Sequence, residues 1–181
     1  MLVFFLVASS CTKEDSIMTE ETLNTDAPIE FLSKNNSKGV IHHVTAGGND
    51  ACAFFGEDPG CDRNYSLTAI MMADGTVKGQ FIDGWKTDNP HAGVHGEITC
   101  MFVDGNMAKV GGVIKKGYAF GMDLAGMYFF AVLKDNGTSK NDAPDQISFT
   151  FLHFVDLCEY TEFFPYESAQ LAITNGQVKI K

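Results

Sequence analysis

Basic residues are scarce in this sequence, and their shortage limits the partners that the protein can have. The 181-residue chain holds 13 Lys and Arg against 23 Asp and Glu, which gives a formal net charge of −10 at pH 7. A nucleic-acid binder needs clustered Lys and Arg to neutralise phosphates, and an anionic membrane surface repels an acidic protein. The charge balance therefore argues against binding to nucleic acid or directly to a membrane surface.

Long apolar runs and helical periodicity are also missing. The apolar run at residues 1–8 is far shorter than the roughly 20 residues that span a bilayer as a helix. No long stretch repeats its apolar residues with the helical period of about 3.6 positions. Since 45% of the residues are hydrophobic, the chain can still build a core, and we expect a folded domain with few helices.

Motifs of nucleophilic catalysis and of zinc binding are absent as well. The sequence contains no Gly-x-Ser-x-Gly motif, no glycine-rich phosphate loop ahead of a helix and no Cys-x-x-Cys pair. Such motifs place a nucleophile on a strained turn, surround a phosphate with backbone N–H groups or hold zinc between thiolates. Their absence argues against the classes of protein that depend on them.

The apolar N-terminus looks like an export signal. Residues 1–8 are apolar and two serines follow, as in a secretory signal peptide. The motif Ala8-Ser9-Ser10-Cys11 resembles the lipobox of bacterial lipoproteins, and the Cys-Thr-Lys-Glu-Asp that starts at Cys11 resembles the start of Bacteroidota lipoproteins sent to the cell surface. The resemblance implies a signal at residues 1–10, acylation of Cys11, and an exported, lipid-anchored protein at the outer membrane or cell surface. A buried N-terminal strand is the alternative.

Two segments with different composition follow the expected signal. Residues 11–38 are polar and lack a sustained period, which predicts a flexible tether, with a short helix around residues 27–33 as the alternative. From Gly39 onward, short apolar or alternating runs are separated by Gly, Asn and Asp. This pattern predicts a single all-β domain over residues 39–181.

Turn signals divide that domain into about eight antiparallel strands. Asp74-Gly75 is the clearest hairpin signal, because a type I′ turn needs two positive φ angles. Neighbours in sequence look like hairpin partners, which favours a small antiparallel barrel over a two-sheet β-sandwich. Glycines at positions 79, 96, 111 and 112 are expected where a coiled sheet bends. The expected strands are residues 40–45, 66–72, 77–83, 94–103, 107–114, 127–134, 146–154 and 171–180.

Several of these segments together resemble a known group of proteins. The segments are DGTVKGQF at residues 74–81, VHGEITC at 94–100, VDGN at 103–106, GGVI at 111–114, and DNG at 135–137 ahead of DQI at 145–147. They are similar to a family of small, exported, uncharacterised all-β bacterial proteins. The resemblance covers roughly residue 39 to the C-terminus. It implies an all-β fold and export, and brings no catalytic residues with it.

The five cysteines divide into one and four. If Cys11 is acylated, an even number remains in an exported protein, where disulfides persist. Cys52 and Cys61 flank a short loop and are expected to pair. Cys100 and Cys158 would then tie a central strand to the last long loop, although Cys100 alone would also suit a small buried thiol.

His95 and Glu97 fall on one face of an expected strand, since alternate residues of a strand share a face. The two side chains could ligate a metal ion together with His42, His43 or His91. They could also pair a general base with its orienting carboxylate. The interpretation that we favour is a surface pair with a weak cross-strand contact.

The acidic loop from Asp135 to Asp145 is a candidate calcium site, because it offers several carboxylate and amide oxygens. Its spacing is not that of an EF-hand loop, and Lys140 lies within it. Turn formation accounts for the same residues and is the interpretation that we favour. No cofactor is therefore assigned.

Aromatic residues are plentiful, with 15 Phe, five Tyr and one Trp. They could line a cavity for an apolar ligand, but filling a core needs the same residues, and we favour the core. Trp85 follows a strand, where an indole either contacts a ligand or covers the end of the core. His153 alternates with Phe149 and Phe151 and is expected to be a hydrogen-bonded core histidine.

These observations predict a lipid-anchored cell-envelope protein with a non-enzymatic binding or envelope-associated role. The partner would be a small apolar molecule, a glycan or a protein, with Trp85, His95 and Glu97 as candidate contacts. A hydrolase or metal-dependent enzyme that uses His95 and Glu97 is the main alternative. A structural or adhesive surface protein is the third.

Overall fold

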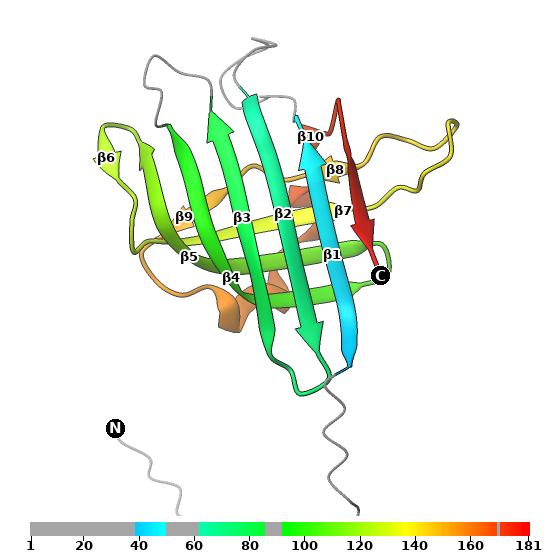
Figure 1. Ribbon diagram of the computed structural model, residues 1–181, viewed down its shortest axis with the longest axis horizontal. Helices are drawn as coiled ribbons and strands as arrows, with labels where there is room; N and C mark the ends of the chain where they lie inside the picture. The colour runs from blue at the N-terminus through cyan, green and yellow to red at the C-terminus, as the bar shows by residue number, and fades with distance from the viewer. Residues whose placement is uncertain (1–38, 50–61, 86–91, 170) are drawn as a thin grey trace, which may run out of the picture. The chain divides into compact units, whose positions relative to one another are not determined.

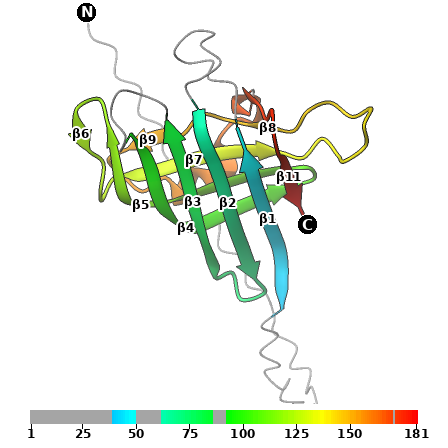
Figure 2. The ribbon, with the colours of Figure 1, turned by 45° about the horizontal axis from the view of Figure 1, so that its top comes forward.

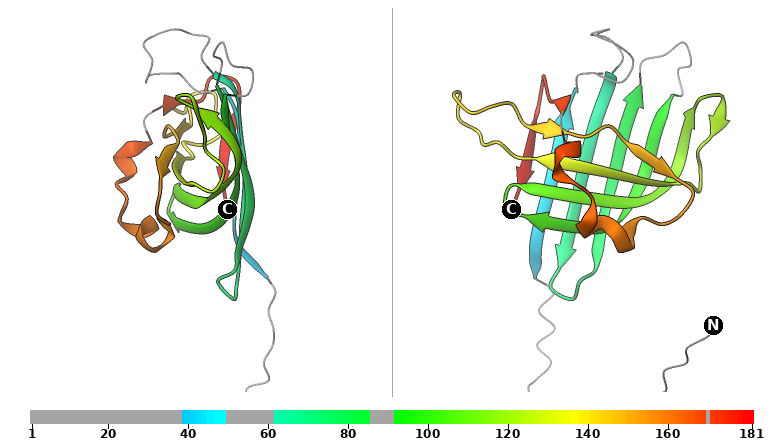
Figure 3. Two further views of the ribbon diagram at one scale, coloured as in Figure 1. Left: turned by 90° about the vertical axis from the view of Figure 1, so that its left-hand side faces the viewer. Right: turned by 180° about the vertical axis from the view of Figure 1, so that it is seen from behind.

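The computed structural model describes residues 39–49, 62–85, 92–169 and 171–181, and most of their regular structure is antiparallel β-sheet (Figure 1). Nine strands are hydrogen-bonded in the order β10-β8-β7-β5-β4-β3-β2-β1-β11, while β6 pairs with β5 and β9 with β7. The sheet curls strongly into a half barrel (Figure 3). The prediction of an all-β, barrel-like domain is confirmed. Within these ranges, no helix has the length and apolar character that a membrane crossing requires.

The strands and two short 3₁₀ helices account for the regular structure of these ranges. They are β1 (Val40–Gly48), β2 (Asp62–Met72), β3 (Val77–Trp85), β4 (Gly93–Asp104), β5 (Met107–Ala119), β6 (Met122–Asp123), β7 (Tyr128–Lys134), β8 (Gln146–Ile147), β9 (Phe151–His153), η2 (Cys158–Phe163), η3 (Tyr166–Ser168), β10 (Leu171–Ala172) and β11 (Gln177–Ile180). The expected strand at residues 171–180 is thus divided into β10 and β11.

The expected strand at residues 146–154 is also divided, into β8 and β9. Residues 148–150 stand opposite two residues of β7, so the strand bulges between its two paired segments. The extra residue reverses which side chains face the core, so Leu152 packs inward and His153 is exposed. The predicted core position of His153 is therefore wrong. Its Nδ1 accepts a hydrogen bond from the N–H of Val155 at 3.1 Å.

The hairpin between β2 and β3 forms where Asp74-Gly75 predicts it, but with a different turn. Gly75 has a φ of 83°, whereas Asp74 does not have a positive φ, so the predicted type I′ turn is wrong. The N–H of Gly75 donates to the carbonyl of Met72, and the N–H of Thr76 donates to the carboxylate of Asp74, each at 2.9 Å. This longer loop needs one positive φ, which glycine adopts without steric cost.

Strands β4 and β5 are long and pass from the front of the domain to the back, where they cross behind β1–β3 (Figure 2). Their pairing shifts register twice, between His95 and Gly96 and between Ile98 and Cys100. A Cβ at Gly96 would overlap the ring of Phe129, so glycine is required there because the ring packs directly on the strand backbone. The predicted role of the strand glycines as bends stays a prediction.

The interior of the half barrel is filled by aromatic and aliphatic side chains. Phe81 of β3 stacks on Phe129 of β7 with ring centroids 4.7 Å apart, and Tyr65 of β2 meets Phe81 edge-on. These three side chains are at most 1% exposed. They are packed against one another and do not line an open space, which removes the basis for a cavity built from them.

The outer face of β5 and β7 is also buried, because residues 157–169 lie against it (Figure 3); we call these residues the cover segment. Phe164 of this segment stacks on Phe130 of β7 with centroids 4.0 Å apart. A disulfide between Cys100 and Cys158 joins β4 to the segment, with Cα atoms 5.5 Å apart. The predicted second cysteine pair is therefore present. The expected Cys52–Cys61 pair and Cys11 lie outside the described residues.

Candidate functional site

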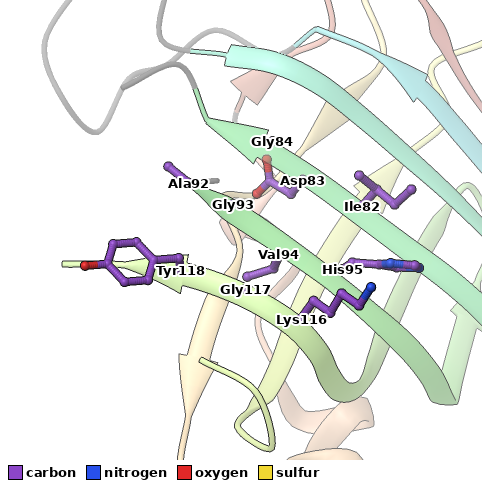
Figure 4. A pocket seen from close by; sticks show the side chains of 10 residues that line it. All are labelled: Ile82, Asp83, Gly84, Ala92, Gly93, Val94, His95, Lys116, Gly117 and Tyr118. Carbon is purple, nitrogen blue, oxygen red and sulfur yellow. The ribbon is translucent and has the colours of Figure 1, made fainter. Parts of the chain in front are cut away.

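An open hollow of about 330 Å³ lies where β3 ends, β4 begins and β5 ends (Figure 4). Its lining comes from these three strands and from the residue before β4. The lining residues are Ile82, Asp83, Gly84, Ala92, Gly93, Val94, His95, Lys116, Gly117 and Tyr118. One of the predicted contacts, His95, is therefore part of a concave surface.

The hollow arises from two adjacent rows of residues that are paired across the strands. Ile82, His95 and Lys116 form one row, and all three are exposed. The next row is Gly84, Gly93 and Tyr118. Because glycine has no side chain, the half-buried Gly84 and the buried Gly93 contribute only backbone to the second row, and we call these two residues the floor. Tyr118 bounds that floor on one side, and the first row bounds it on the other (Figure 4).

A bulge in β5 determines which lysine reaches the hollow. His95 pairs with Lys116 and Gly96 pairs with Ile114, so Lys115 is the extra residue and both lysines are exposed. Lys115 forms an ion pair with Glu97 of β4, with Nζ 2.8 Å from the carboxylate oxygen. Lys116 has no carboxylate partner among the described residues. The bulge therefore leaves one neutralised and one uncompensated lysine.

His95 and Glu97 are not joined as a catalytic pair. The carboxylate of Glu97 contacts Lys115, and both of these side chains are 55% exposed. His95 makes no hydrogen bond or ion pair with any residue in the described part of the chain. An acid–base pair needs the base and its orienting group within hydrogen-bonding distance. The weak surface contact that we favoured thus involves Glu97 and Lys115 instead of His95.

Metal binding by the predicted histidines has no geometric basis in the described ranges. His42 and His43 lie on β1, which is separated from β4 by β2 and β3. His91 lies outside the described residues. Where side chains are described, no group of three or more His, Cys, Asp or Glu is placed to hold a metal ion.

The acidic loop between β7 and β8 uses its carboxylates on the backbone. Asp145 is 7% exposed and accepts hydrogen bonds from the N–H groups of Asn136 at 2.8 Å and Val178 at 2.6 Å. Asp135 accepts from the N–H of Ile180 at 3.1 Å. The contacts with Val178 and Ile180 satisfy outward-facing donors of β11, the strand at the end of the sheet. The carboxylates proposed for calcium therefore hold the sheet edge.

Trp85 belongs to the core side of its strand. It is partly buried and packs against the main hydrophobic cluster, on the same side of β3 as Phe81 and Asp83. Asp83 is 4% exposed, and its carboxylate accepts a hydrogen bond from the hydroxyl of Thr150. Of the two roles considered for Trp85, its packing matches the cover over the end of the core.

Lys109 is buried beneath the cover segment, with a side chain 1% exposed. Its Nζ donates to the carbonyl oxygen of Glu162 at 2.6 Å and lies 4.4 Å from the ring centroid of Tyr166. Burial lowers the pKa of Lys109, and nearby carboxylates, Asp104 first among them, oppose part of this shift. Burial also raises the pKa of Tyr166, and Asp104 adds to that effect. Because the amine is enclosed, it holds the segment and is not open to a ligand.

His95 is the one lining residue that was predicted as a contact, and the lining side chains of Lys116 and Tyr118 were not. A signal for Lys116 was present, since Lys115 and Lys116 are the sole adjacent basic pair in an acidic sequence. The position of Tyr118 beside a glycine floor depends on strand register, which local sequence does not show. Comparisons with protein-family models, with curated proteins and with solved structures found no match to this chain.

Proposed function

We propose that this protein is a lipid-anchored cell-envelope protein whose β-domain binds a small ligand, without catalysis, at the hollow between β3, β4 and β5. The observation that carries the binding role is the glycine-floored hollow itself, bounded by Tyr118 on one side and by His95 and Lys116 on the other. Concave surfaces with a few convergent polar groups are the usual location of ligand sites.

A binding role accounts for the side chains of the hollow better than a catalytic one. The imidazole of His95 has no orienting partner among the described residues, and the nearby carboxylate of Glu97 is paired with Lys115. General acid–base catalysis needs two groups with assigned protonation roles near one reacting atom. The described residues of the hollow offer contacts to a ligand without such a pair.

Two independent features favour an envelope location. The sequence Ala8-Ser9-Ser10-Cys11 resembles a lipobox, and acylation of Cys11 would provide a firm anchor, since each buried methylene adds about 0.8 kcal/mol. The bond between Cys100 and Cys158 is of the kind that persists in oxidising compartments outside the cytoplasm. An acidic domain on such an anchor would be repelled from anionic headgroups.

Lipidation is tested with the full chain and the variant Cys11→Ala. Radioactive palmitate should label the wild-type protein, and the variant should remain unlabelled and unprocessed. Cys158→Ser serves as the control for loss of a thiol elsewhere and should label as the wild type does. Equal labelling of the Cys11→Ala protein would contradict the proposed anchor.

Binding at the hollow is tested by NMR titration of the ¹⁵N-labelled domain. The probes are short oligosaccharides, a tripeptide mixture and laurate, which represent the three ligand classes considered. We expect at least one probe to shift the amides of Gly93, Val94 and Gly117 in a saturable manner, with no change in the cover segment. If every probe leaves those amides unchanged, the proposed binding site is wrong.

A further inference from the structure

We infer that the ligand of the hollow is a saccharide that carries a carboxylate, with Lys116 contacting the carboxylate and Tyr118 packing against the sugar ring. This inference rests on the proposed binding function and names its ligand class. Three features of the site lead to it: an uncompensated positive charge, a bare floor and an aromatic wall.

The positive charge is the first feature, because Lys116 is an exposed lysine that lines the concave surface. Lys115 is neutralised by Glu97, whereas Lys116 lines the hollow, with its side chain running beside His95 in Figure 4, and has no carboxylate partner in the described part of the chain. His95 is its neighbour across the strand pair. An exposed amine beside an imidazole provides donors for a charge-assisted hydrogen bond to an anion. The buried Asp83 does not compete, because it faces the core and accepts from Thr150.

The floor is the second feature. Gly84 and Gly93 are paired on adjacent strands, so no side chain stands between Ile82 and the ends of these strands on this face. A flat ring can therefore approach the backbone closely. The hollow is open, so it suits one segment of a longer chain better than a molecule that must be fully enclosed.

The aromatic wall is the third feature. Tyr118 is half-buried at the end of β5 and lines the hollow, and in Figure 4 its ring extends from the strand on the side away from His95 and Lys116. A tyrosine offers an apolar ring face together with a polar hydroxyl group. The C–H face of a pyranose packs on such a ring, while its hydroxyl groups remain solvated. A fatty acid also carries a carboxylate, but its alkyl chain needs an enclosed apolar cavity, which this open hollow does not offer. A nucleic acid is disfavoured by the charge of the whole protein.

The test is a calorimetric titration of the full chain with tetragalacturonic acid and with its methyl ester. The two probes share one carbohydrate chain and differ in charge. Sialyllactose and lactose form a second pair, and succinate is the anion without a sugar ring. We expect each acidic saccharide to bind at least tenfold more tightly than its neutral partner, and succinate to bind more weakly than either acidic saccharide.

Three variants test which side chains are responsible for the preference for the acidic saccharide and for binding of the sugar ring. Lys116→Met should remove the preference for the acidic saccharide and leave binding of the methyl ester unchanged. Lys115→Met, the adjacent lysine that Glu97 already neutralises, should keep the preference. Tyr118→Ala should weaken the acid and the ester by the same factor. Circular dichroism and the melting temperature of each variant establish that it is folded.

The remaining outcomes separate the two proposals. Equal binding of acid and ester would overturn the carboxylate class and leave the binding site in place. The same holds if no saccharide binds but a peptide or laurate shifts the floor amides. A preference for the acid that survives in Lys116→Met would overturn the assigned contact. If no probe of any class reaches the floor, both the ligand class and the proposed function fall.

Discussion

Strands β3 and β7 lie in the same sheet but are buried in different ways. Along β3, Lys78, Gln80 and Ile82 are exposed while Phe81 and Asp83 are buried, so one face meets water. In β7, the five residues from Phe129 to Leu133 are all buried. The difference arises because the outer face of β7 is covered by residues 157–169, whereas the outer face of β3 has no such cover in the described ranges.

This comparison shows that one part of the curled sheet forms the core while another part presents a solvent-exposed face. Strands that are buried on both faces need apolar side chains throughout and a segment that stays on top of them. Here that segment is held by aromatic stacking, the buried Lys109 and a disulfide. A strand with one solvent-exposed face can have polar residues and glycines on that face, and the candidate site lies there. The predictions below test this division, from the largest expected effect to the smallest.

Removing an aromatic ring beneath the cover should cost the most. Phe130→Ala deletes a fully buried side chain that stacks on Phe164, so the free energy of unfolding should fall by about 3–5 kcal/mol. Ile82→Ala changes a side chain on the solvent-exposed face of β3 that is 36% exposed, so the free energy of unfolding should fall much less. Urea unfolding measures both. Equal losses would contradict the difference between the two faces.

Removing the disulfide should cost somewhat less and act on one region. The Cys100→Ser/Cys158→Ser double variant opens a link between residues 58 positions apart, and about 2–4 kcal/mol of stability should be lost. Amide hydrogen exchange should accelerate first in the cover segment, with β1–β3 still protected. If amide exchange accelerated equally across the whole sheet, the disulfide would not stabilise the protein by holding the cover segment in place.

Removing a carboxylate from the sheet edge should have an intermediate effect. Asp145→Ala leaves the N–H groups of Val178 and Asn136 without their acceptor, which should cost about 1–3 kcal/mol. Asp142→Ala is the matched control, because Asp142 is exposed and serves the N–H of Ser139 within its own loop. Thermal unfolding should separate the two variants. If the two variants have the same melting temperature, the contacts of Asp145 at the sheet edge do not stabilise the fold more than the loop contact of Asp142 does.

Replacing Lys109 should have the smallest effect and a distinct pH dependence. Burial lowers the pKa of Lys109 in the folded protein from an ordinary value of 10.5, so the unfolded chain binds more protons between the two values. The free energy of unfolding from this group therefore rises with pH in the range just below 10.5. Lys109→Met should remove that rise, and the exposed Lys115→Met should retain it. Denaturant unfolding at a series of pH values measures the slope, and an unchanged slope in Lys109→Met would refute this account.

Much of the fold could be predicted from local patterns. Alternation over residues 77–83 matches the buried and exposed faces of β3, and the continuous apolar run at residues 127–134 is largely the doubly buried β7. The hairpin at Asp74-Gly75 is also a local feature. These succeed because side-chain alternation and backbone freedom act over a few residues.

The candidate site was predicted only in part, and the errors share a cause. The sequence pointed to His95 and Glu97 as a surface pair, yet Glu97 pairs with Lys115, and a bulge in β5 places Lys116 opposite His95. It placed His153 in the core, yet the bulge at residues 148–150 turns it outward. A bulge depends on how two distant strands pair, so a period read along one strand cannot reveal it.

The amino-acid sequence by itself determined that this protein is an acidic, all-β molecule. It also determined which residues are available as a core, because apolar content and alternation are properties of the chain. The tertiary structure decided which faces are covered, that Cys100 meets Cys158, and that Lys116 and Tyr118 stand beside bare glycines. These outcomes follow from strand register and from packing between segments far apart in the chain, where a shift of one residue moves every side chain to the other face.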